Sequence, residues 1–280
     1  MIKQIDSMWW LKLNGLIRSY IAHGGLTPLV PIYIVTEHQK SGGTWLSQLI
    51  TTSLNIPFPR NRLPPLGSCL LHGQFRNKWN MKKPVILWRD GRDVIVSEYF
   101  YHIVADVTSH GYPAEVRKKL NYSDPHDIEN NLPHFIEYAM NQKLHSHHTW
   151  PSFVDYWHGT PGAIETSYEA LREDTLKELT RIVEQLTKKN NIDKNILIDT
   201  IEKFSFKNQT TRKAGQEDRK SFLRKGVVGD WKNNFSSEAS TIFDFHAGEQ
   251  LIKLGYEKDH SWAEHKNHDN KSFIKLVRQS

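Results

Sequence analysis

Short apolar runs alternate with longer amphipathic stretches along most of this chain. Four short stretches are predicted as strands; they cover residues 32–36, 68–73, 84–90 and 162–169, and the first is continuous, β-branched and ended by polar residues, which indicates a buried parallel strand. Apolar positions at helical spacing predict helices at residues 44–54, 91–106, 133–147, 170–189, 193–204 and 237–256. Because strands alternate with helices, we predict an α/β fold: a single domain with a central parallel sheet flanked by helices.

The remaining stretches divide the chain into a main domain and two flanking segments. We expect an N-terminal amphipathic segment at residues 1–30, a main domain at 31–256 and a basic C-terminal tail at 257–280. Within the main domain, residues 107–131 are polar and are expected to be irregular. A second polar loop is expected after the helix at 193–204, running to about Gly229.

The N-terminal segment alternates apolar residues with charges at Lys12 and Arg18. Such a helix either covers the core or lies on a membrane surface, and we expect it to cover the core. No apolar run approaches the ~20 residues that a membrane-spanning helix needs, so we predict no stable membrane insertion. A cytoplasmic location is the expectation that follows.

Composition narrows the class of protein only slightly. The 37 Lys and Arg residues against 31 Asp and Glu residues give a net charge of +6, which suits an anionic ligand, a nucleic acid or an acidic membrane surface. The single cysteine, Cys69, excludes an intrachain disulfide and with it the disulfide-stapled secreted class. Cys69 lies in the apolar run SCLLH, where we expect a buried, unreactive thiol.

The stretch HQKSGGTW, residues 38–45, directly follows the first predicted strand and opens the first predicted helix. Its two glycines allow close approach of a ligand, and the amides at a helix N-terminus attract anions. Lys40 adds a positive charge. The loop resembles a P-loop in placement only, because the ATP-binding pattern GxxxxGK[ST] has its lysine after the last glycine.

Two further stretches carry the same kind of chemistry. WRDGRDVIVS places Arg89 at the end of the third predicted strand and Ser97 in the helix that follows. RKGVVGDWKNNF, residues 224–235, places two cations before a loop whose glycines can wrap an anion. Because ligands bind beyond the carboxyl ends of parallel strands, we expect these stretches to meet at one site.

Together, in this order, the three stretches resemble the motifs of the PAPS-dependent sulfotransferase family, in its cytosolic-type domain. The similarity extends over about residues 31–256. It implies an enzyme that transfers the sulfuryl group of 3'-phosphoadenosine 5'-phosphosulfate (PAPS) to a hydroxyl or amine of a small organic acceptor, with PAP as the product and with no metal.

The resemblance also implies roles for individual residues. The 5'-phosphosulfate would be held by Lys40, Ser41, Gly42, Gly43 and Thr44, and the 3'-phosphate by Arg89, Ser97, Arg224, Lys225 and Gly226. The adenine would lie among Trp45, Tyr168 and Phe206. The catalytic set would be His72 as general base, Lys40 and Ser97. The acceptor pocket is expected around Phe75, Trp79, Tyr101, His102 and Trp150.

The chain departs from the family pattern at several positions. Gln39 stands where the family often has a proline, and Leu70 stands where the cytosolic enzymes have a second lysine near the catalytic histidine. The dimerisation pattern KxxxTVxxxE corresponds here to KNNFSSEAST, so a homodimer of that kind is in question. HSHH at 145–148 has no carboxylate or cysteine partner in the sequence pattern, and we predict no metal site.

Two other functions compete with this interpretation. A P-loop nucleotide kinase would explain the glycine loop, although Lys40 precedes the glycines. A nucleic-acid-binding or other anion-binding protein would explain the basic charge. We expect no nucleic-acid partner, because the cations cluster at three loops rather than along one stripe.

Overall fold

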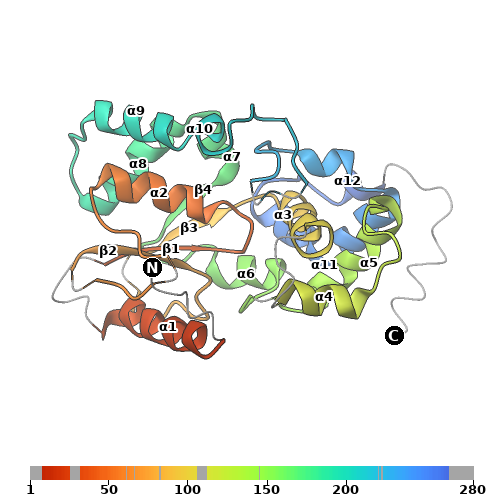
Figure 1. Ribbon diagram of the computed structural model, residues 1–280. Helices are drawn as coiled ribbons and strands as arrows, with labels where there is room; N and C mark the ends of the chain where they lie inside the picture. The colour runs from red at the N-terminus through yellow and green to blue at the C-terminus, as the bar shows by residue number, and fades with distance from the viewer. Residues whose placement is uncertain are drawn as a thin grey trace.

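A four-stranded, fully parallel sheet lies at the centre of the protein (Figure 1). In this computed structural model the described residues are 8–25, 32–60, 62–65, 67–81, 83–105, 112–144, 146–219, 221 and 223–264. The strands are β1 (Ile32–Glu37), β2 (Cys69–Gly73), β3 (Val85–Trp88) and β4 (Ile164–Ser167), in the order β2-β1-β3-β4. All four predicted strands are confirmed.

Helices cover both faces of the sheet, which confirms the predicted fold class. They are α1 (Met8–Tyr20), α2 (Gly43–Ser53), α3 (Gly91–Tyr99), α4 (Tyr112–Leu120), α5 (Ile128–Asn141), α6 (Trp150–Trp157), α7 (Tyr168–Glu173), α8 (Thr175–Thr187), α9 (Lys194–Lys203), α10 (Phe206–Thr210), α11 (Ser237–Lys253) and α12 (Ser261–Glu264). Shorter helical turns are η1 (Ile21–Gly25), η2 (Phe100–Val104) and η3 (Asp230–Asn233).

Strand side chains alternate between two hydrophobic clusters, as the pleat of a strand requires. Val35 and Leu87 point into the cluster formed with α2, α8 and α9, whereas Ile34 and Ile86 point into the larger cluster formed with α3, α5, α6 and α11. Figure 1 shows these two groups of helices on opposite sides of the strands. Both faces of the central strands β1 and β3 are therefore largely buried, which explains why these strands are mostly apolar, whereas the edge strand β4 carries polar residues.

The expectation that residues 107–131 are irregular was wrong. Tyr112–Leu120 forms helix α4, and α5 begins at Ile128, five residues earlier than predicted, because the side chain of Asp127 accepts a hydrogen bond from the Asn130 amide and caps it. Residues 106–111 lie outside the described part of the chain. The start of α5 was missed because it is set by the capping side chain of Asp127, which the spacing of apolar residues does not reveal.

The helix predicted at 170–189 is two helices. Ser167 caps α7 by accepting a hydrogen bond from the Ala170 amide, which also ends β4 two residues before the predicted strand end. Asp174 ends α7 and caps α8 by accepting from the Lys177 amide at 3.0 Å. Capping side chains therefore decide both boundaries.

The N-terminal helix packs beside the strands, near β1 and β2 in Figure 1. Ile21 and Ala22 are buried in the larger cluster, while Leu16 and Tyr20 are 70% and 67% exposed. Arg18 donates a hydrogen bond to the main-chain carbonyl of His72. Within the described residues, no helix combines the length and apolar character needed to cross a bilayer.

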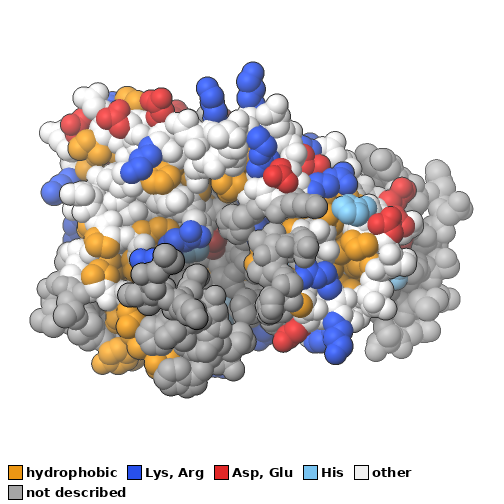
Figure 2. Space-filling model, viewed as in Figure 1, with side chains coloured by type: hydrophobic (Ala, Val, Ile, Leu, Met, Phe, Trp, Pro, Cys, Tyr) orange, Lys and Arg blue, Asp and Glu red, His pale blue; other side chains and the backbone are white. Residues whose placement is uncertain are grey.

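Charged residues are dispersed over the surface. Figure 2 shows Lys and Arg side chains at several separate places on the visible face, interspersed with acidic and apolar side chains, and they form no single stripe.

The single cysteine, Cys69, is fully buried as expected, and burial raises the pKa of its thiol.

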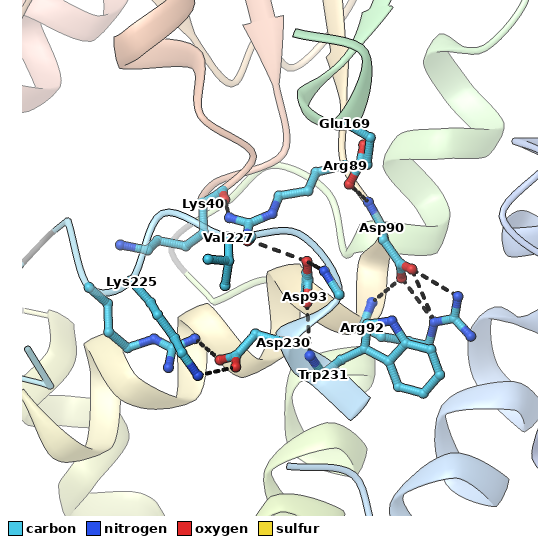
Figure 3. Close-up of polar contacts among 12 residues, drawn as sticks. Lys40, Arg89, Asp90, Arg92, Asp93, Glu169, Lys225, Val227, Asp230 and Trp231 are labelled. Atoms are coloured by element: carbon cyan, nitrogen blue, oxygen red, sulfur yellow. Dashed lines mark hydrogen bonds and ion pairs between the residues drawn. The ribbon is translucent and has the colours of Figure 1, made fainter. Parts of the chain in front are cut away.

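The start of α3 is tied to the distant loop at 224–231. The Asp93 carboxylate accepts hydrogen bonds from the amides of Gly229 and Trp231, at 2.8 and 2.9 Å (Figure 3). Arg92 pairs with Asp90 at 2.8 Å, and its guanidinium lies 3.8 Å from the ring centroid of Trp231. These contacts join segments more than 130 residues apart in the sequence.

Replacing Asp93 with Ala is expected to destabilise the fold. Two main-chain amides would lose their acceptor in a buried environment, at about 1–3 kcal/mol each, so unfolding in urea should show a loss of roughly 2–6 kcal/mol. The exposed Asp199→Ala on α9 is the matched control and should change stability by less than about 0.5 kcal/mol. Equal stability of the two variants would contradict the role given to Asp93.

Candidate active site

The loop between β1 and α2 forms one wall of the site. Lys40 and Gly42 both have left-handed backbone conformations, with φ of 65° and 103°. A Cβ at Gly42 would lie 2.9 Å from Cδ2 of Tyr168, so the close approach of this ring needs glycine. The loop ends at Gly43, where α2 begins with its amides directed toward the end of the sheet, a favourable place for an anion.

Arg89, just after β3, joins this loop to the 224–229 loop. Its guanidinium donates to the carbonyl of Lys40 at 2.9 Å and to the carbonyl of Val227 at 3.5 Å (Figure 3). It also lies 4.5 Å from the ring centroid of Tyr168. Among the described residues, neither Arg89 Nε nor the buried Ser41 hydroxyl has a hydrogen-bond partner. Both are buried donors whose hydrogen-bonding capacity the described residues leave unused.

The 224–229 loop brings two more cations to the same place. Arg224 and Lys225 each bind the Asp230 carboxylate at 2.5 Å. Burial would raise the pKa of Asp230, but the hydrogen bonds from Lys225 and Arg224 outweigh it and lower the pKa to about 2. Gly226 has φ of 65°, and a Cβ there would lie 2.5 Å from the Phe206 ring, so this turn also needs glycine.

These loops enclose one cavity of about 290 Å³. Of the residues predicted to bind the cofactor, all except Ser41 line it: Lys40, Gly42, Gly43, Thr44, Trp45, Arg89, Ser97, Tyr168, Phe206, Arg224, Lys225 and Gly226. Ser41 lies in the same loop and is almost fully buried. The sequence analysis did not single out the other lining residues, which are Glu37, Gln48, Arg60, Arg172, Phe204, Gln209, Leu223 and Val227.

Aromatic side chains line the same cavity, among them Trp45, Tyr168 and Phe206. Trp45 and Tyr168 meet edge to face, with ring centroids 5.8 Å apart. The indole Nε1 of Trp45 donates to the carbonyl of Phe204 at 3.1 Å, which fixes the ring. Phe206 begins α10, where Ser205 caps the helix. Rings of this kind offer flat surfaces to a heterocyclic base.

Lys40 is electrostatically unusual. Desolvation, together with the nearby Arg89 charge, lowers the pKa of Lys40 to about 8. Its Nζ lies 4.5 Å from the centroid of the Tyr101 ring. Beside it, burial raises the pKa of Glu98 to about 8, and burial lowers the pKa of His38 to about 4. Lys40, Glu98 and His38 thus share a poorly solvated region that disfavours their charged forms.

His72 lies at the end of β2, beside this loop. Its Nε2 is 2.8 Å from Oε1 of Glu37, the last residue of β1. The second oxygen of Glu37 accepts a hydrogen bond from the Gly43 amide. The sequence analysis did not predict a role for Glu37. Its position at a strand end, directly before a basic loop, is a signal that could have identified it as a candidate site residue. Its partner His72 is 35 residues away in the sequence, so only the fold shows the contact.

Comparisons with known proteins identify the family of this chain. A family model described as the sulfotransferase domain matches residues 74–255. The chain belongs to the sulfotransferase family. Among curated relatives, Sulfotransferase 1E1 of Cavia porcellus is 26% identical over 78% of this chain and 82% of its own length. Sulfotransferase 1E1 of Homo sapiens is 28% identical over 60% of this chain and 55% of its own length.

Two solved structures have a fold similar to that of this chain. A mouse sulfotransferase, SULT7A1, crystallised with PAP, superposes with a TM-score of 0.57 at 17% identity, over 89% of this chain and 95% of that one. Retinol dehydratase in complex with androsterone and PAP gives a TM-score of 0.56 at 17% identity, over 86% and 85% of the two chains.

The residues expected to form the acceptor pocket of this sulfotransferase do not gather at one described cavity. Phe75, His102 and Trp150 are buried, and Trp150 packs under Gly91, where a Cβ would lie 2.6 Å from its ring. Trp79 is 74% exposed. Tyr101 is the member of the set that contacts the site, through Lys40.

In the part of the chain that the structure describes, no group of three or more His, Cys, Asp or Glu side chains could hold a metal ion. His145 in the HSHH stretch lies outside the described residues.

The lowered pKa of Lys40 predicts pH-dependent anion binding by this sulfotransferase. Lys40 is charged below about pH 8 and loses its charge as the pH rises, so the affinity for PAP should fall by about tenfold between about pH 7 and about pH 9.5. Lys40→Arg keeps its charge in this range and should flatten the profile. Calorimetric titrations of both proteins measure this; identical profiles would contradict the assignment.

Proposed function

We propose that this sulfotransferase transfers the sulfuryl group of PAPS to a hydroxyl or amine of a small organic acceptor. The observation that carries the proposal is a single cavity where the 38–45 loop, Arg89 with Ser97, and the 224–229 loop converge. The partnerless Ser41 hydroxyl and Arg89 Nε, both buried at this site, supply donors of the kind that phosphate or sulfate oxygens accept.

The site has separate places for two anionic groups. Lys40, Ser41 and Thr44, with the amides that begin α2, would hold the 5'-phosphosulfate. Arg89, Ser97, Arg224, Lys225 and Gly226 would hold the 3'-phosphate, since guanidinium groups match phosphate oxygens in pairs. Trp45, Tyr168 and Phe206 would hold the adenine. The residues present therefore fit PAPS at both ends.

The chemistry follows from these positions. When bound, PAPS supplies a sulfuryl group attached to a phosphate, which is a good leaving group. Lys40 would stabilise the negative charge that develops on the leaving oxygen, an effect that is strong in a poorly solvated site. His72 would accept the proton of the acceptor hydroxyl or amine. Leu70, where the cytosolic enzymes have a second lysine, is fully buried in the apolar cluster with Val35 and Leu46, so Lys40 would act without that partner.

Turnover of PAPS against a panel of phenols, alcohols and amines, followed by mass spectrometry, tests the activity. The wild-type protein should add one sulfuryl group to at least one acceptor. His72→Ala should then lower kcat by at least about 100-fold, because the general base is lost, while the Kd for PAP changes by less than about threefold. The exposed His126→Ala is the matched control and should retain wild-type turnover.

Two outcomes would contradict the proposal at different levels. Absence of sulfated product with every acceptor in the panel would contradict the transfer activity. Product formed by His72→Ala at a rate near that of the wild type would remove His72 from the reaction and leave the activity itself intact.

A further inference from the structure

Glu37 connects the proposed base to the anion loop. As the last residue of β1, it places Oε1 2.8 Å from His72 Nε2, and its Oε2 accepts a hydrogen bond from the Gly43 amide. The side chains of Glu37 and His72 are 8% and 19% exposed. One largely buried carboxylate thus touches both the imidazole and the first amide of α2.

The backbone is shaped for this three-way contact. A Cβ at Gly43 would lie 2.5 Å from His72 Nε2 and would also overlap the Glu37 carboxylate. Parallel pairing of β1 with β2 brings the two strand ends side by side, with Val35 opposite His72. A glycine at position 43 is therefore a condition for the carboxylate and the imidazole to meet beside the loop.

The position of Glu37 is costly for a site that binds anions. Its carboxylate lines the same cavity as Lys40, Arg89 and Arg224. A negative charge there repels an anionic ligand and competes for the Gly43 amide. A residue that merely supported the fold would not need a charge at this place, which points to a task in the reaction.

We propose that Glu37 is a positioning residue that holds His72 with its ring proton on Nε2 and so leaves Nδ1 as the basic nitrogen. This inference rests on the proposed role of His72. The acceptor's O–H or N–H bond breaks and its proton forms a new bond to Nδ1. The freed acceptor atom bonds to sulfur as the bond from sulfur to the phosphate oxygen breaks, and that oxygen keeps the electron pair. The Glu37 carboxylate stabilises the imidazolium that results, as in other carboxylate–histidine pairs.

Two opposite effects of Glu37→Gln follow from this arrangement. The amide NH₂ of Gln can donate to Nε2, which moves the ring proton to Nδ1 and blocks the base, so kcat should fall by at least about 100-fold. The lost negative charge should leave the Kd for PAP equal or lower, by up to about tenfold. A purely structural role predicts instead that turnover and PAP binding weaken together.

The test measures kcat and the Kd for PAP in the wild type, Glu37→Gln, Glu37→Asp, His72→Ala and the double variant Glu37→Gln/His72→Ala. Glu37→Asp keeps the charge and should recover part of the kcat lost in Glu37→Gln. Because Glu37 acts through His72, the double variant should be no slower than His72→Ala alone. The exposed Glu129→Gln on α5 is the control for the loss of a charge.

Each outcome bears on one claim. Wild-type kcat in Glu37→Gln, or a kcat loss matched by equally weakened PAP binding, would overturn the positioning role. A double variant slower than His72→Ala would show that Glu37 acts independently of His72 and would also overturn it. If His72→Ala retains full activity, the proposed role of His72 as the base is wrong, and with it the role of Glu37. If His72→Ala is inactive but Glu37→Gln is fully active, only the proposed role of Glu37 is wrong.

Discussion

The site depends on the two hydrogen bonds by which Arg89 joins separate loops. Its guanidinium donates to the carbonyl of Lys40 and to that of Val227, so one side chain holds the first loop against the last. The donor is a cation that also contacts the Tyr168 ring and Asp93, so the bond to Lys40 at 2.9 Å is charge-assisted, while the bond to Val227 at 3.5 Å is longer and weaker. Without them, the loops would present their cations separately rather than around one cavity.

Gathering cations in one place requires counter-charges, and the chain supplies them from outside the cavity. Asp230 neutralises Arg224 and Lys225, and Asp93 fixes the loop that carries them. Glu37 is different because its carboxylate lines the cavity itself and pairs with His72. The distinction separates charges that organise the binding site from the one that we connect with proton transfer.

The sequence predicted the sheet and the loops that line the cavity, because their signals are local. Short apolar runs indicated the central strands, and the glycines and cations of HQKSGGTW and RKGVVGDWKNNF indicated the loops. What it missed depends on contacts across the fold. The role of Glu37 depends on its contact with His72 on a neighbouring strand, and the role of Asp93 depends on its hydrogen bonds with the amides of Gly229 and Trp231.

Helix boundaries were missed for another reason. Asp127, Ser167 and Asp174 each begin a helix by accepting a main-chain hydrogen bond, and apolar periodicity does not register such caps. The residues expected around the acceptor do not share one cavity of the described part of the chain. Aromatic type alone did not distinguish Trp150, which packs in the core, from Tyr101, which lies against Lys40.

The central claim is that two anionic groups of one ligand bind at two separate sets of donors, Lys40 with the loop that begins α2 and the cations Arg89, Arg224 and Lys225. Calorimetric titration with PAP and with AMP, which lacks the 3'-phosphate, tests it most directly. Charge-assisted hydrogen bonds from Arg89, Arg224 and Lys225 at about 1.5–3 kcal/mol each predict that AMP binds at least about 100-fold more weakly. Affinities for AMP and PAP within about threefold of each other would contradict the account.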